Sequence, residues 1–194
     1  MTDEELTAVR SAKAGDAEAF AVVVRLHARP LFRTAVRIVG SEPAAEDVVQ
    51  ETLLRAYRAI GRFDESAELA PWLQRIAINA AIDELRRAQR EAPLARRGPD
   101  GEWADLEPAS AAPSPEREAA SARLGAAAAR ALDRLSPDER TAFVLRHLEG
   151  RPIADIARAL GKRENATKQS IFRAVRKLRR ALAAWTEVPR EELA

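Results

Sequence analysis

The chain has 194 residues, enough for one large domain or two small ones, and 46% of them are hydrophobic although only 5% are aromatic. It contains no cysteine, which excludes a disulfide framework, a thiolate zinc site and a thiol nucleophile. The net charge is only +2 although 32% of the residues are charged, so any surface for a charged partner has to come from local patches.

No segment approaches the ~18 uninterrupted apolar residues that a membrane span needs. The first residues, Met1 to Glu5, are acidic and do not resemble a secretion signal. We therefore predict a protein that works in the cytoplasm, without membrane insertion.

Residues 1–90 are predicted to form a first helical domain, because their apolar content is mostly alanine, leucine, valine and isoleucine. A long helix is expected to reach about Val39, with Pro30 as a kink or a break. The next helix, which Ser41 or Glu42 opens, has a continuous apolar face. That face consists of Val49, Leu53, Ala56, Tyr57 and Ile60.

The last helix of this domain, from about residue 71 to residue 90, carries a polar stripe on a largely apolar surface. The stripe consists of Arg75, Asn79, Asp83, Arg86 and Arg90. A helix of this composition is expected to bury its apolar side and to present the stripe to a partner.

Residues 91–117 are predicted to be a flexible, acidic linker rich in proline and alanine. Residues 91–115 include five prolines, and residues 98–118 hold six acids against one base. A segment of this kind cannot bury enough apolar surface to fold by itself.

Residues 118–185 are predicted to be a second small helical domain, followed by a tail at 186–194. Ser136 and Glu139 form a capping box with Pro137 at the first helical position, so a helix begins there. A short apolar-faced helix then ends at Gly161. The last helix is expected to turn four residues to the core: Ile171, Val175, Leu178 and Leu182. The fold class is therefore all-α, with two small helical domains.

A short helix, a turn with a glycine and a longer basic helix together predict a helix-turn-helix. Residues 161–180 hold eight bases against one acid. Side chains near the start of the second helix would enter the ~12 Å wide major groove of DNA. The candidate contacts are Arg163, Asn165, Lys168, Gln169, Arg173 and Arg176. The alternative is an ordinary solvated basic helix, which the preceding short helix and turn disfavour.

Three groups of residues resemble the extracytoplasmic-function (ECF) group of RNA polymerase sigma factors. Residues 45–57 are similar to the segment that sigma factors present to the clamp of the polymerase. Residues 72–87 resemble the promoter-melting region, and residues 135–178 resemble the C-terminal domain of the same group. The match covers about 5–90 and 120–183, in the family's order and on both sides of a linker.

The resemblance implies a role for each surface. Core polymerase would bind Asp47, Gln50 and Glu51. Single-stranded DNA of the −10 element would contact Trp72, Arg75, Asn79, Arg86 and Arg87, with bases flipped out of the stack and the loop at 63–70 shaping a pocket. Asp83 would orient arginines. For Trp72, anchoring in the core and contact with a base both remain open.

The resemblance thus implies a non-catalytic subunit that brings core RNA polymerase to promoters, reads duplex DNA at −35 and helps to open it at −10. It also implies an anti-sigma protein as a partner. No cofactor, metal or catalytic residue is expected, because His27 and His147 lack nearby ligands and no phosphate-binding glycine loop is present.

Two alternatives remain. A regulator that binds duplex DNA alone would share the helix-turn-helix but would not need the clamp-like face at 45–57. A purely protein-binding adaptor would leave the basic patch unexplained. The turn at 162–165 also departs from the family's usual apolar residue and proline, so the family's −35 sequence preference is not transferred to this chain.

Overall fold

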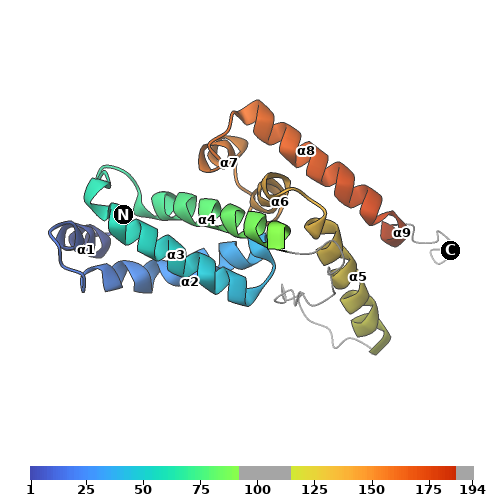
Figure 1. The fold of residues 1–194 in the computed structure, drawn as a ribbon, viewed down its shortest axis with the longest axis horizontal. Helices are drawn as coiled ribbons and strands as arrows, with labels where there is room; N and C mark the ends of the chain where they lie inside the picture. The colour runs from blue at the N-terminus through green and yellow to red at the C-terminus, as the bar shows by residue number, and fades with distance from the viewer. Residues whose placement is uncertain (92–114, 187–194) are drawn as a thin grey trace.

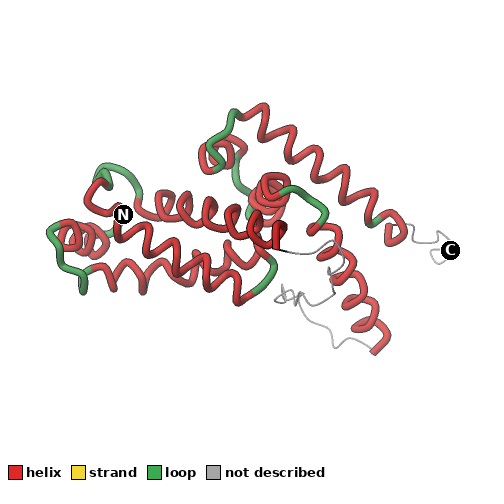
Figure 2. Tube along the Cα trace, in the orientation of Figure 1, coloured by secondary structure: helices red, strands yellow, loops and turns green. Residues whose placement is uncertain are grey.

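The structure, a computed structural model, describes residues 1–91 and 115–186, and the regular elements in these ranges are all helices (Figures 1 and 2). The predicted all-α fold is confirmed. Most of the predicted linker and all but one residue of the tail lie outside the described residues. In the first half the helices are α1 (Asp3–Lys13), α2 (Phe20–Val39), α3 (Glu42–Ala59), the 3-10 turn η1 (Ile60–Arg62) and α4 (Leu69–Glu91).

The second half begins with α5 (Pro115–Asp133) and ends with the short α9 (Ala183–Thr186). Between them lie α6 (Pro137–Phe143), its π-helical continuation η2 (Val144–Leu148), α7 (Ile153–Ala159) and α8 (Glu164–Ala181). None of the described helices combines the length and the apolar character that a membrane span requires.

Helices α2, α3 and α4 pack side by side, and α1 packs against α2 (Figure 1). Their core includes the fully buried side chains of Val23, Ile38, Leu73 and Ile78. Pro30 does not break α2, which continues to Val39. The proline removes only one backbone N–H donor, and the contacts of α2 with α1, α3 and α4 hold the helix in place.

The buried face of α3 is turned toward Val48 and Thr52 relative to the predicted one, and it does not include Tyr57. Thr52 is fully buried and donates its hydroxyl to the carbonyl of Val48 at 2.6 Å, whereas Tyr57 is partly exposed. The ring of Tyr57 lies edge-on against Phe20, with 5.2 Å between ring centroids. A threonine whose hydroxyl bonds within its own helix can thus occupy a fully buried position on α3.

In the second half, the predicted capping box opens α6. The Glu139 amide donates to the Ser136 hydroxyl at 3.2 Å, and the Ser136 amide donates to the Glu139 carboxylate at 3.0 Å. A small buried cluster then joins α5 to α8, and it consists of Ala131, Leu132, Leu135, Ala174 and Leu178.

The two halves are packed against each other, because α4 contacts both α6 and α7. Val144, Leu145 and Ile156 are fully buried in the same apolar cluster as the cores of α2, α3 and α4. At the edge of this joint, the amide of Gln89 donates to the carbonyl of Leu135 at 3.3 Å. The apolar side of the short helices thus continues the core of the first half.

Arg140 is the most constrained side chain at the joint. It is only 5% exposed, and its guanidinium donates to Asp133 at 2.7 Å while lying against Gly40 at the end of α2. Burial lowers the pKa of Arg140, and the ion pair with Asp133 opposes this effect. A buried guanidinium is costly unless its acidic partner stays in place, so the groups that surround Arg140 have to pack closely against it.

Substitution of Gly40 tests this fit. Gly40 has φ +77° and a β-carbon there would overlap the guanidinium of Arg140, whereas Gly15 has φ +100° and faces open space. We expect Gly15→Ala to lower the free energy of unfolding by about 1–2 kcal/mol through backbone strain alone. Gly40→Ala should cost a further 1–3 kcal/mol or so, because it also displaces a buried group. Urea denaturation measures both, and equal losses would contradict the joint described here.

Candidate nucleic-acid interface

The predicted polymerase-binding residues lie together on the outer side of α3. Asp47 and Gln50 are exposed and Glu51 is half-exposed. Leu54 lies on the same side, because positions i, i+3, i+4 and i+7 of a helix share one face, and its side chain is 43% exposed. The sequence analysis missed Leu54, although the spacing from Asp47 was the signal that could have found it.

A bridge of ion pairs links this face of α3 to the polar stripe of α4. Arg55 donates to Glu51 at 2.6 Å and to Asp83 at 3.4 Å, and Asp83 lies 3.8 Å from Arg86. The hydrogen bond to Glu51 is the main reason why the pKa of Arg55 is raised. Asp83 therefore holds two arginines, the arrangement that the sequence suggested for it.

The stripe of α4 is exposed along its length, and three of the predicted DNA contacts belong to it: Arg75, Asn79 and Arg86. Arg87, a further predicted contact, is exposed beside Arg86. Trp72 precedes Asn79 by two helical turns and is half-buried, with its ring centroid 5.0 Å from that of Phe63. The tryptophan is thus anchored in the core. Contact between its exposed part and a base stays a prediction.

The loop that precedes α4 is fixed by α1. Glu65 accepts from Arg10 at 2.8 Å and from Lys13 at 2.9 Å, and Lys13 also donates to the carbonyl of Phe63 at 3.1 Å. The hydrogen bond from Arg10, together with the weaker effect of the one from Lys13, holds the pKa of Glu65 below its usual range. The amino group of Met1 adds an ion pair with Glu68. The loop that was expected to shape a pocket for a base therefore has defined supports.

The second predicted DNA surface is built on α7, the turn at Gly161 and α8. Gly161 has φ +61°, which allows the tight turn, and Lys162 is held by Asp138 at 2.5 Å. The predicted contact residues are all exposed: Arg163, Asn165, Lys168, Gln169, Arg173 and Arg176. They are therefore accessible to a partner, although Arg173 also makes an ion pair with Glu139 at 3.2 Å.

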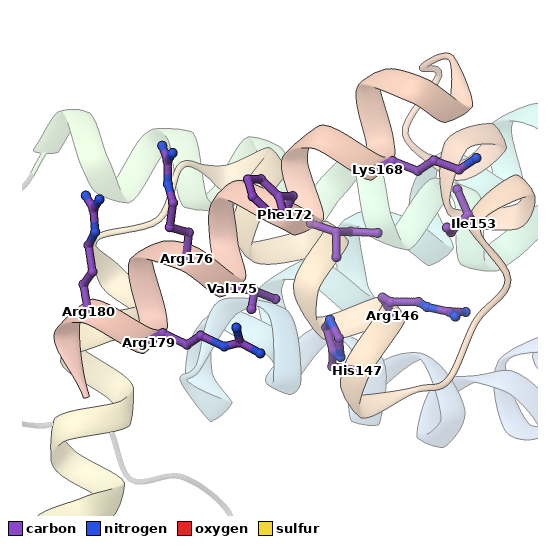
Figure 3. Close-up of a pocket in the computed structure, with 10 residues that line it drawn as sticks. Arg146, His147, Ile153, Lys168, Phe172, Val175, Arg176, Arg179 and Arg180 are labelled. Carbon is purple, nitrogen blue, oxygen red and sulfur yellow. The ribbon is translucent and has the colours of Figure 1, made fainter. Parts of the chain in front are cut away.

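Phe172 lies in the middle of this surface, and the sequence analysis did not select it. Its side chain is 66% exposed. Phe172 lies three residues after Gln169 and four residues before Arg176, so the three side chains share one face of α8. Figure 3 shows Arg176 and Arg180 pointing to one side of α8, away from Val175 and His147. A large apolar ring among polar neighbours on one helix face was the signal that could have predicted this residue. A phenylalanine in such a position can contact the methyl group of a thymine.

A groove of about 540 Å³ runs along α8, beside the predicted DNA contacts (Figure 3). Its apolar lining includes Ile153, Ile171 and Val175, and its rim carries basic side chains such as Arg146 and Arg179. Ile171 packs against the core as predicted, although it is only half-buried and also lines the groove. Val175 is half-buried and lines the groove without belonging to either core cluster, so the prediction for Val175 was wrong.

Small residues fill the face of α8 that packs on the rest of its domain. Thr167, Ser170 and Ala174 are buried there, and both hydroxyls donate to backbone carbonyls within α8 at 3.2 and 3.1 Å. A hydropathy pattern underrates such a face, because threonine and serine count as polar although their hydrogen bonds are satisfied locally.

The two histidines do not form a metal site with other ligands. His27 lies 2.8 Å from Glu5, and the ring of His147 packs on Phe143 at 4.9 Å between centroids. Over residues 1–91 and 115–186, no three side chains of the metal-binding types are grouped together.

Comparison with known proteins identifies both halves. The family model described as Sigma-70 region 2 matches residues 23–91, and the one described as Sigma-70, region 4 matches residues 126–178. The ECF RNA polymerase sigma factor SigM of Mycobacterium tuberculosis is 35% identical over 93% of this chain and 85% of its own length. This chain belongs to the ECF group of RNA polymerase sigma factors.

Other sigma factors are similar over comparable lengths. The RNA polymerase sigma-H factor of Pseudomonas aeruginosa is 32% identical over 93% of both chains. Among solved structures, CnrH in complex with the cytosolic domain of CnrY has a TM-score of 0.60 at 26% identity, covering 94% of this chain and 99% of that one. RpoE of Bartonella quintana, bound to the anti-sigma factor NepR, has a TM-score of 0.57 at 25% identity, covering 86% and 98%.

The function of this chain follows from its membership of the ECF group. It binds core RNA polymerase, recognises the −35 and −10 elements of promoters and promotes the opening of DNA for transcription initiation. In this chain, region 2 comprises α2, α3 and α4, and region 4 comprises the end of α5 together with α6, α7 and most of α8.

Proposed function

We propose that three exposed surfaces of this sigma factor divide the work of promoter recognition. Core polymerase binds the outer side of α3 through Asp47, Gln50 and Glu51. The melted −10 strand binds the stripe of α4, and the −35 duplex binds the start of α8. The observation that carries this assignment is the stripe of α4, because a long helix that is otherwise largely buried keeps Arg75, Asn79 and Arg86 exposed, with Arg87 exposed beside them.

Each residue type suits its partner. Asn79 offers an amide that can donate to and accept from a base edge, and the arginines of the stripe neutralise phosphates. Lys168, Gln169 and Arg173 near the start of α8 contact base edges in the major groove, and Arg176 contacts the backbone of the duplex. Arg163 and Asn165, at the end of the turn, complete this set of contacts.

We also propose that an anti-sigma protein binds this chain, as CnrY binds CnrH and NepR binds RpoE in the complexes named above. The chain acts in the cytoplasm with core polymerase and contributes no catalytic group of its own, since the chemistry of RNA synthesis belongs to the core enzyme. In the alternative, a regulator that binds DNA alone, the acidic face of α3 would have no partner.

Reversal of two charges on α3 tests the polymerase contact. We expect Asp47→Lys combined with Glu51→Lys to weaken binding to core polymerase roughly 100-fold, because like charges across an interface cost several kcal/mol. Co-purification with core polymerase measures the effect. Asp3→Lys combined with Glu18→Lys is the control, since these acids are exposed and lie outside α3. Undiminished co-purification of the α3 variant would refute the assignment.

Replacement of Asn79 tests the −10 contact. Asn79→Ala should lower the yield of open complex about tenfold, the size of one base contact, and should leave initial binding to duplex promoter nearly unchanged. Permanganate footprinting detects the unpaired thymines of the opened region. Gln74→Ala is the control, because Gln74 lies on the same helix outside the stripe. Equal open-complex yields for the Asn79 variant and the wild type would remove Asn79 from the assignment.

A further inference from the structure

Glu139, at the start of α6, lies between two of the basic side chains of α8. Its side chain is 6% exposed, and its two carboxylate oxygens accept from Arg173 at 3.2 Å and from Lys177 at 2.6 Å. The same carboxylate accepts from the amide of Ser136 and so completes the capping box. One buried acid thus fixes the start of α6 and one side of the recognition helix together.

The charge on Glu139 is stable in this environment. Burial alone would raise the pKa of its carboxyl group, but the hydrogen bonds from Lys177 and from the Ser136 amide outweigh this effect, and the pKa is lowered. Glu139 is therefore ionised at neutral pH. A buried carboxylate has to keep its cationic partners close, because losing one leaves an uncompensated charge.

Arg173 is held from two directions as a result. Its Nε donates to Glu139, and an Nη group approaches the hydroxyl of Ser170 at 3.4 Å. The Ser170 hydroxyl is itself fixed by its bond to the carbonyl of Ala166. The planar guanidinium, which is 46% exposed, is therefore bonded on one edge and retains donors on its free edge.

We propose that Glu139 is a positioning residue for −35 recognition, which acts by fixing the guanidinium of Arg173 against the side of α8. This inference rests on the proposed contact between Arg173 and the −35 duplex. A long side chain that is ordered before binding loses less conformational entropy when it meets a base edge. Glu139 thereby adds to sequence discrimination although an acid opposes the general attraction for DNA.

The test compares holoenzymes on two promoters. One is a promoter found by transcription with the wild-type holoenzyme, and the other is the same DNA with the −35 element scrambled. The ratio of the two affinities measures −35 discrimination. Glu139→Gln keeps an oxygen for the capping box but removes the charge, and we expect it to lower this ratio about tenfold, the value of one base contact. Asp155→Asn, which removes an exposed acid paired with Arg158, should leave the ratio unchanged.

A double-mutant cycle separates positioning from a general effect of charge. Arg173→Ala should lower the ratio by a similar factor, and Glu139→Gln should cause no further loss in that background. A wild-type ratio near one would remove the −35 assignment itself. In a second case the wild type discriminates normally while Glu139→Gln leaves the ratio intact, or changes it only as much as Asp155→Asn does. Either result would overturn the positioning role of Glu139 but not the −35 assignment.

A second variant keeps the test decisive if Glu139→Gln does not fold. Arg173→Lys preserves the charge at an exposed position but lacks the rigid planar donor set. We expect it to lower the ratio while leaving the salt dependence of binding unchanged, since the number of cations is the same. Retention of the full ratio would mean that Arg173 acts as an unpositioned cation, and it would overturn the inference.

Discussion

The close packing of helices through small side chains is the constraint on which the exposed surfaces depend. Ala56 on α3, Ala81 on α4 and Ala174 on α8 are fully buried at helix contacts. Helices that meet through alanine can approach each other closely. The rest of each helix circumference stays free for polar residues, which is how α3, α4 and α8 each keep a face for a partner.

Acids within the basic surfaces fix the directions of the arginines. Asp83 on α4 pairs with Arg55 of α3 and with Arg86 of its own helix, and Glu139 pairs with Arg173 on α8. Each acid reduces the net attraction for a polyanion but orders a long side chain whose freedom would otherwise be lost on binding. An acid that pairs with an arginine therefore occurs on both predicted DNA surfaces.

Much of the fold could be predicted from local patterns, because helix caps and apolar spacing act over a few residues. The capping box at Ser136 is where the sequence placed it. The packing of the two halves could not be predicted, since the contact of Gly40 with Arg140 joins residues a hundred positions apart. Local hydrogen bonds also hid the buried face of α8, where Ser170 replaces the apolar residue that a hydropathy pattern requires. The candidate residues came from the predicted helix-turn-helix and from the resemblance to the family, and their roles remain predictions.

Promoter specificity conferred on core RNA polymerase is the property that unites the three surfaces. Run-off transcription from a genomic library, with core enzyme alone and with the chain added, tests for this property. We expect start sites that appear only when the chain is present and that share a −35 and a −10 element upstream. An unchanged set of transcripts, together with binding of the free chain to specific duplex DNA, would contradict this expectation and would favour a regulator that acts without joining the polymerase.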